Sequence, residues 1–206
     1  GLEAHPELQA LIRGYAQDAR SELMQAVSGL GNDKPAAPYE LSLAFEKVLQ
    51  SADLIVVSAD GSRYTGGAHG EPLVARFVWL IKERKQLTAQ ALIPDPAGWE
   101  QIGQAVAQRL HAAAEQRVEA DRVPVEEQAE QVASADRMIA EGTAAQADNF
   151  AQFVPVLNSA GKISALRFVF PPYQVGPYSD GTQTAEIPAA TLLAWVAPEY
   201  AHLFAR

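Results

Sequence analysis

The alternation that decides the fold class lies at residues 39–46, where the sequence reads YELSLAFE. Large apolar side chains occupy every second position, and they are Tyr39, Leu41, Leu43 and Phe45. A period of two residues predicts a strand with one buried face and one hydrated face. Strands of this kind are typical of antiparallel sheets, because parallel strands are usually buried on both faces.

More strands are predicted directly after this segment. Apolar runs at residues 54–58 and 73–82 indicate two of them. Between these runs, Asp60-Gly61 is a two-residue hairpin signal, because both residue types tolerate a positive φ. The sequence therefore predicts that the chain reverses at Gly61 and returns through residues 62–65.

A second group of strands is predicted near the C-terminus. Residues 153–157 and 163–170 flank the turn sequence Asn158-Ser159-Ala160-Gly161, which indicates a hairpin. A short strand is predicted at residues 184–187, followed by helical turns that begin at Pro188 and Pro198.

Three helices complete the pattern. Apolar residues recur at helical spacing over residues 6–28, from Trp99 to Val118, and from Val125 to Ile139 with Gly142 as the predicted stop. The order helix, strands, helices, strands favours an α+β fold with antiparallel sheets packed with helices and an N-terminal helix, built as two small lobes sharing one core. Three segments are expected: residues 1–38, 39–95 and 96–206.

Composition limits the classes of function. The chain has 206 residues, a net charge of −9 and no cysteine. Its acidity disfavours nucleic acids and anionic membranes and favours a basic protein partner. The absence of cysteine excludes disulfides, thiolate metal sites and a cysteine nucleophile. No apolar run is long enough to span a bilayer. The chain opens on Gly1 rather than Met, which we interpret as a trimmed sequence that leaves room for an upstream export signal or lipid-carrying Cys.

Two short segments are candidates for a functional site. The first runs from Tyr64 to Gly70 and places His69 beside paired glycines; a bulge or tight bend is the structural alternative. The second runs from Phe170 to Gly181 and contains three prolines, which stiffen the backbone. A rigid crossover loop is its structural alternative. Tyrosines on a stiff loop suit binding, and the predicted contact residues are Tyr64, His69, Tyr173, Gln174, Tyr178 and Asp180.

Signals for catalysis and metal binding are poor. The four histidines are far apart in sequence and form no metal-ligand pair, so neither a metal nor a cofactor is predicted. No Gly-x-Ser-x-Gly elbow occurs. A metal-assisted hydrolase that uses His69 and Asp180 stays open as an alternative. A structural or assembly role for the Ala/Gln/Glu-rich helices is another.

The two segments resemble a pair of bacterial domains of unassigned function. This pair forms the extracellular part of the lysozyme-sensing anti-sigma-V factor, precedes the catalytic domain in some peptidoglycan deacetylases, and occurs alone in envelope lipoproteins. The similar stretches are residues 64–69, residues 77–92, and residues 170–178 with Ile187-Pro188. The sequence departs from the usual pattern at Gly70 and Glu71, and it contains neither a sigma-binding segment nor a deacetylase domain.

The resemblance implies an exported, often lipid-anchored protein of the periplasm or cell surface, with no catalytic residues in these domains. We therefore expect a non-enzymatic binding protein. The ligand suggested by the resemblance is lysozyme, a basic protein, and peptidoglycan fragments are the alternative ligand.

Overall fold

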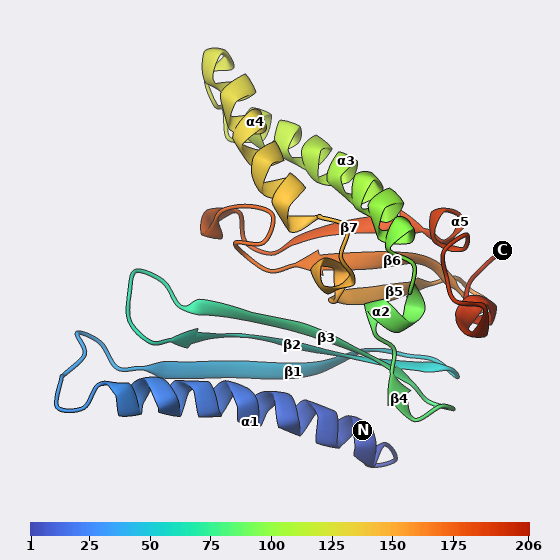
Figure 1. Cartoon of the computed structure of the whole chain (residues 1–206), viewed down its shortest axis with the longest axis horizontal. Coiled ribbons are helices and arrows are strands. Elements are labelled where there is room, and N and C mark those ends of the chain that lie inside the picture. The colour runs from blue at the N-terminus through green and yellow to red at the C-terminus, as the bar shows by residue number, and fades with distance from the viewer. The chain divides into compact units, whose positions relative to one another are not determined.

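A computed structural model describes residues 1–206, which form two compact units, Gly1–Leu87 and Thr88–Arg206 (Figure 1). Each unit combines one antiparallel sheet with helices. The predicted α+β class with an N-terminal helix is therefore confirmed. The segment boundaries at residues 38 and 95, and the sharing of one core, remain predictions. No helix in the chain combines the length and the apolar character needed to cross a membrane.

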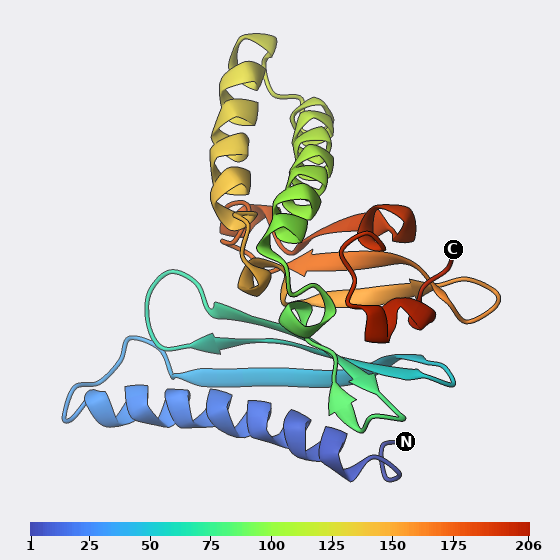
Figure 2. The same ribbon diagram turned by 45° about the vertical axis from the view of Figure 1, so that its right-hand side comes forward.

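The first unit is a four-stranded sheet with one long helix. Its elements are α1 (Pro6–Gly29), β1 (Glu40–Gln50), β2 (Leu54–Tyr64), β3 (Glu71–Leu80) and β4 (Lys85–Gln86). The strands lie in sequence order, and every neighbouring pair is antiparallel. Helix α1 runs along one face of this sheet (Figures 1 and 2).

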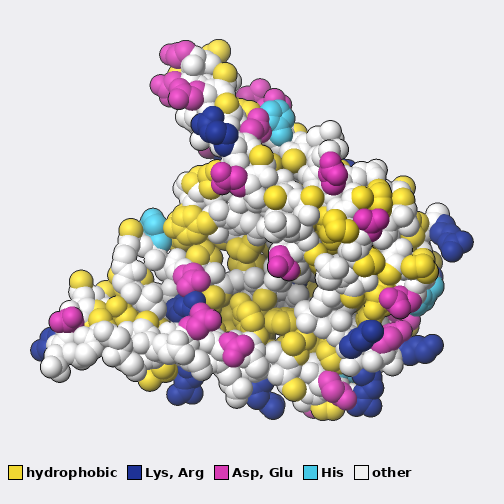
Figure 3. All heavy atoms as spheres, in the orientation of Figure 1, with side chains coloured by type: hydrophobic (Ala, Val, Ile, Leu, Met, Phe, Trp, Pro, Cys, Tyr) yellow, Lys and Arg dark blue, Asp and Glu magenta, His cyan; other side chains and the backbone are white.

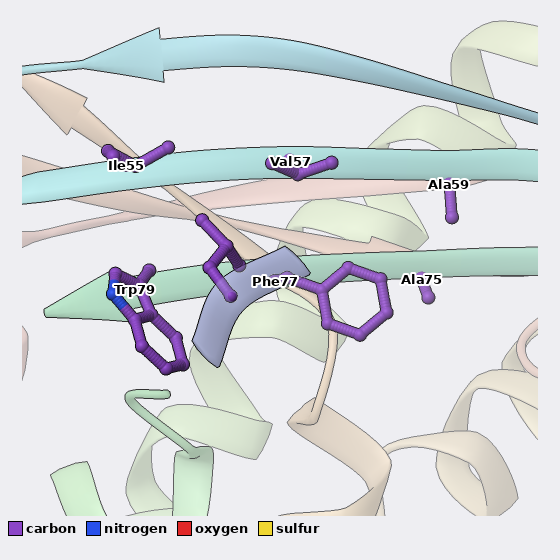
Figure 4. Packing of buried hydrophobic residues seen from close by; sticks show 7 residues of the cluster. Ile55, Val57, Ala59, Ala75, Phe77 and Trp79 are labelled. Atoms are coloured by element: carbon purple, nitrogen blue, oxygen red, sulfur yellow. The ribbon is translucent and has the colours of Figure 1, made fainter. Parts of the chain in front are cut away.

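The core of the first unit lies between α1 and the central strands. Side chains of alternate residues on β2 and β3 point to the same side of the sheet (Figure 4), and they are Ile55, Val57, Ala59, Ala75, Phe77 and Trp79. Leu8 of α1 is fully buried against them, and Tyr15 meets Phe77 edge to face at 5.5 Å between ring centroids. The helical spacing predicted for residues 6–28 thus places an apolar stripe of α1 on the sheet.

Strand β1 is the edge of the sheet, and its apolar side chains are less buried than its alternation predicts. None of its residues is buried; Leu41 and Leu43 are half-buried, and Phe45 is 38% exposed. The alternation correctly predicts a strand and its inner face. It overstates burial because an edge strand has a neighbour on one side only.

The hairpin predicted at Asp60-Gly61 is wrong. Strand β2 continues through both residues to Tyr64, and the chain reverses at residues 65–70. Gly61 instead permits a close approach of two strands, because a Cβ atom there would overlap the carbonyl oxygen of Ser42 on β1. The positive φ values occur at Gly66 and Gly67, in the turn that joins β2 to β3.

The second unit contains a three-stranded sheet and a helical hairpin. Its main elements are α2 (Ala89–Leu92), α3 (Pro96–Ala120), α4 (Val125–Gly142), β5 (Phe153–Leu157), β6 (Ile163–Phe170), β7 (Gln183–Pro188) and α5 (Ala189–Leu192). The strand order is β5-β6-β7, all antiparallel, and the predicted hairpin at residues 158–161 joins β5 to β6. Helices α3 and α4 lie side by side and project away from this sheet (Figure 2).

Aromatic residues form the core of the second unit. Trp99 of α3 stacks on Phe150 with 5.0 Å between ring centroids, and both rings meet Phe168 of β6 edge to face. The indole Nε1 of Trp99 donates a hydrogen bond of 2.9 Å to the carbonyl oxygen of Ile93. The three rings are at most 2% exposed, so the cluster fixes α3 against the sheet.

Candidate functional site

The loop between β6 and β7 begins with a tight reversal at Pro171–Gly176. The backbone N–H of Tyr173 donates to the carbonyl of Gly176 at 3.0 Å, and that of Gln174 donates to Pro171 at 3.1 Å. Tyr173 has a φ of 78°, in the left-handed region that non-glycine residues rarely adopt. This loop carries four of the six residues predicted to bind a ligand.

Gln174 ties the loop to the end of α4. Its Nε2 donates hydrogen bonds to the carbonyl oxygens of Gly142 at 3.1 Å and Asn149 at 2.8 Å. Gly142 is the last residue of α4, where the sequence predicts that the helix stops. The glycine lets the loop approach the helix closely, because a Cβ there would overlap the Gln174 carbonyl oxygen and lie 2.8 Å from Cγ1 of Val175. The Gln174 side chain therefore fixes the loop to the protein's own backbone.

A second tie involves Asp180, which the sequence also places among the candidate contact residues. Arg117 of α3 donates from Nη1 to Oδ2 of Asp180 at 3.1 Å and from Nη2 to Oε1 of Gln183 at 3.3 Å. The Asp180 side chain is only 19% exposed. Arg117 lies 63 residues away in sequence, and the pattern of residues gives no sign that it pairs with Asp180.

Tyr173 and Tyr178 remain at the surface of this fixed loop. They are 52% and 40% exposed, and their ring centroids are 5.7 Å apart with an angle of 38° between the planes. Two adjacent aromatic rings with phenol groups offer apolar area and hydrogen-bonding capacity together. The ligand role of Tyr173 and Tyr178 stays a prediction.

The first candidate segment forms the turn between β2 and β3. The hydroxyl of Tyr64 donates to the carbonyl of Gly67 at 3.0 Å, and its ring meets Tyr39 edge to face at 6.5 Å. His69 is exposed in this turn. The structural alternative of a tight bend thus describes the local backbone, and the ligand role of Tyr64 and His69 stays a prediction.

A cluster that sequence reasoning missed joins α3 to α4. Nδ1 of His111 lies 2.7 Å from Asp136 of α4, and Nε2 lies 3.0 Å from Glu115, one helical turn along α3. The hydrogen bond to Asp136 is the main cause that raises the pKa of His111 above its usual value, and the charges of Asp136 and Glu115 raise the pKa further. The spacing of His111 and Glu115 by four residues is the one signal of this cluster in the sequence.

This cluster predicts a pH dependence of stability. Because the folded pKa of His111 is raised, protonation stabilises the fold fully below the ordinary value of 6.5, and this contribution is lost as pH rises through the folded pKa. The difference in unfolding midpoint between the wild type and His111→Gln should therefore grow as pH falls from about 8 to about 6. Urea titrations at several pH values measure it, and a constant difference would contradict the pairing.

No group of three or more His, Asp or Glu side chains is arranged to hold a metal ion. The hydrolase alternative needs Asp180 as a ligand, and the Arg117 guanidinium is bound to that carboxylate. This pairing argues against the alternative, because a metal would have to displace a charged hydrogen-bond partner.

The aromatic core and the tyrosine loop of the second unit coincide with a known family model. Residues 94–190 match the model described as Protein of unknown function (DUF3298). The matched segment includes the loop from Pro171 to Gly181, whereas the turn that contains His69 lies outside it. No curated protein matches the chain in sequence.

Solved structures of DUF3298 proteins share the fold. A DUF3298 family protein from Pseudomonas aeruginosa PAO1 superposes with a TM-score of 0.60 at 17% identity, covering 99% of this chain and 84% of that chain. A DUF3298 member from Bacteroides fragilis NCTC 9343 superposes with a TM-score of 0.51 at 16% identity, covering 94% and 69%. At these identities the similarity establishes the fold alone.

Proposed function

We propose that this chain is a non-catalytic, exported protein of the bacterial cell envelope that binds a basic protein through Tyr173 and Tyr178. The observation that carries the proposal is an exposed pair of tyrosine rings on a loop that the side chains of Gln174 and Asp180 tie to α4 and α3. Lysozyme is the candidate ligand. Peptidoglycan fragments are the alternative ligand, and calorimetric titration of the chain with them would detect their binding.

The fixed loop supports tight binding for an entropic reason. Ordering a mobile loop on association costs free energy, whereas a loop already held by Gln174 and Asp180 loses little freedom. Tyrosine is among the residues that contribute most to interface energies, since it buries a large area with two rotatable side-chain bonds. A pair of such rings at one position therefore suits the centre of a contact surface.

Net charge supports a basic partner. The chain carries −9, so a cationic protein is attracted at long range and approaches faster at low ionic strength. The resemblance of residues 64–69 and 170–178 to the extracellular region of the lysozyme-sensing anti-sigma-V factor supports lysozyme in particular. The same resemblance supports export and a lipid anchor in the periplasm or on the cell surface.

Replacing both tyrosines is expected to weaken lysozyme binding about 30-fold or more, since an interface tyrosine contributes about 1–2 kcal/mol on truncation. Tyr173→Asn suits the left-handed backbone there, and Tyr178→Ser completes the variant. Calorimetric titration measures the affinity, and circular dichroism checks the fold.

Phe45→Thr is the matched control, because Phe45 is an exposed aromatic residue of the first unit, 38% exposed on β1. Its affinity should equal that of the wild type. A folded double variant that binds lysozyme as tightly as the wild type would remove the tyrosine pair from the contact surface.

A further inference from the structure

A groove lies between the C-terminal half of α3 and the N-terminal half of α4. Its volume is about 610 Å³, within the range of sites that accept several side chains. Its apolar lining comes from both helices and includes Val118 of α3 with Val125, Ala129 and Val132 of α4.

The apolar face of α4 is incompletely covered. Val125, Ala129 and Val132 follow one another at spacings of four and three residues, so they form one stripe. Yet only Ile139 and Gly142 of this 18-residue helix are buried, and Val125 is 80% exposed. The buried residues of α4 thus lie near its C-terminal end, and its first turns are open to solvent.

The rim of the groove is acidic. Residues 115–136 contain seven carboxylates and two arginines, a formal charge of −5. Glu115, Glu119 and Asp136 belong to the lining itself; Glu115 and Asp136 also contact His111, and one of the arginines, Arg117, is paired with Asp180. Figure 3 shows carboxylates gathered on the projecting end of the hairpin.

We infer that this groove binds a basic amphipathic helix of a protein partner. The apolar face of such a helix would cover Val125, Ala129 and Val132, which are exposed or partly exposed, and its Lys and Arg residues would face the carboxylates of the rim. Helix-in-groove recognition uses apolar residues at spacings of three, four and seven, which match the stripe on α4. A helix bound in the groove would bury the apolar residues that are exposed in the first turns of α4.

The charge on the groove selects this occupant over others. An anionic membrane surface or a nucleic acid would be repelled by the carboxylates of residues 115–136, whose formal charge is −5. A second copy of the chain would bring the same carboxylates face to face. The carboxylates and the apolar stripe thus both favour a cationic amphipathic helix. The lining of the groove contains no residue of the tyrosine loop, which is the contact surface of the proposed function.

The test uses a synthetic Leu/Lys amphipathic helical peptide and the whole chain. We expect saturable binding, weakened about tenfold or more by Ala129→Lys, which places a cation and a long side chain in the groove. The matched control is Gln131→Lys, which adds the same charge to an exposed, adjacent position outside the lining. Its affinity should stay within about twofold of the wild type.

Three results would overturn the inference. The first is no binding of the peptide by the wild type. The second is equal weakening by Ala129→Lys and Gln131→Lys, which would mean diffuse attraction by net charge. The third is a dimer in sedimentation that Ala129→Lys dissociates, which would make a second copy the occupant. Lysozyme affinity measured on the same variants separates this inference from the proposed function, because neither substitution lies on the tyrosine loop.

Discussion

Replacement of Trp99 by Ala is expected to lower the free energy of unfolding of the second unit by about 3–5 kcal/mol. Trp99 is 2% exposed and stacks on Phe150, so its removal leaves a cavity bounded by aromatic rings. The rings cannot collapse into it without moving α3 from the sheet. Urea denaturation followed by circular dichroism at 222 nm measures the change.

Trp99→Phe separates the two contributions of this residue. It keeps an aromatic ring in the stack but removes the hydrogen bond from Nε1 to the Ile93 carbonyl. Its cost should be smaller, about 1–3 kcal/mol, because a buried carbonyl loses its donor and some volume is lost. A Trp99→Ala protein that unfolds within about 1 kcal/mol of the wild type would show that the cluster is not the core of this unit.

The second large effect is expected at Gly142. Gly142→Ala should destabilise the second unit by about 1–3 kcal/mol, because the added Cβ overlaps the Gln174 carbonyl oxygen and that backbone must move. The shift would also lengthen the hydrogen bonds of the Gln174 side chain, so the tyrosine loop should lose order. Thermal unfolding measures the loss of stability, and calorimetric titration with lysozyme measures the effect on binding by the tyrosine loop.

Gly14→Ala is the matched control for Gly142→Ala. Gly14 lies inside α1, and an added Cβ there meets nothing within 4 Å. The substitution should stabilise the protein by up to about 1 kcal/mol, because Ala favours the helix more than Gly does. If both substitutions stabilised the protein, the close contact between Gly142 and the loop would be wrong.

The sequence predicts the elements of this fold better than it predicts the site. Helix α1, the hairpin at residues 158–161 and the stiff loop after β6 follow from local periodicity and turn residues. Asp60-Gly61 misleads because pairing along the whole of β2 with β1 and β3 outweighs a local turn preference.

The ties that hold the tyrosine loop are not predictable from spacing. Arg117 reaches Asp180, and Gln174 reaches Gly142, across 63 and 32 residues. Each pairing depends on how α3 and α4 lie on the sheet, and that arrangement is decided by the aromatic core. The His111–Asp136 pair, across 25 residues, is hidden for the same reason.

The proposed binding of a basic protein is tested by calorimetric titration of the wild-type chain with a basic lysozyme at low and at moderate salt. We expect saturable binding whose affinity falls as salt screens the attraction between the acidic chain and the cationic ligand. No heat and no change in melting temperature at either salt concentration would contradict it.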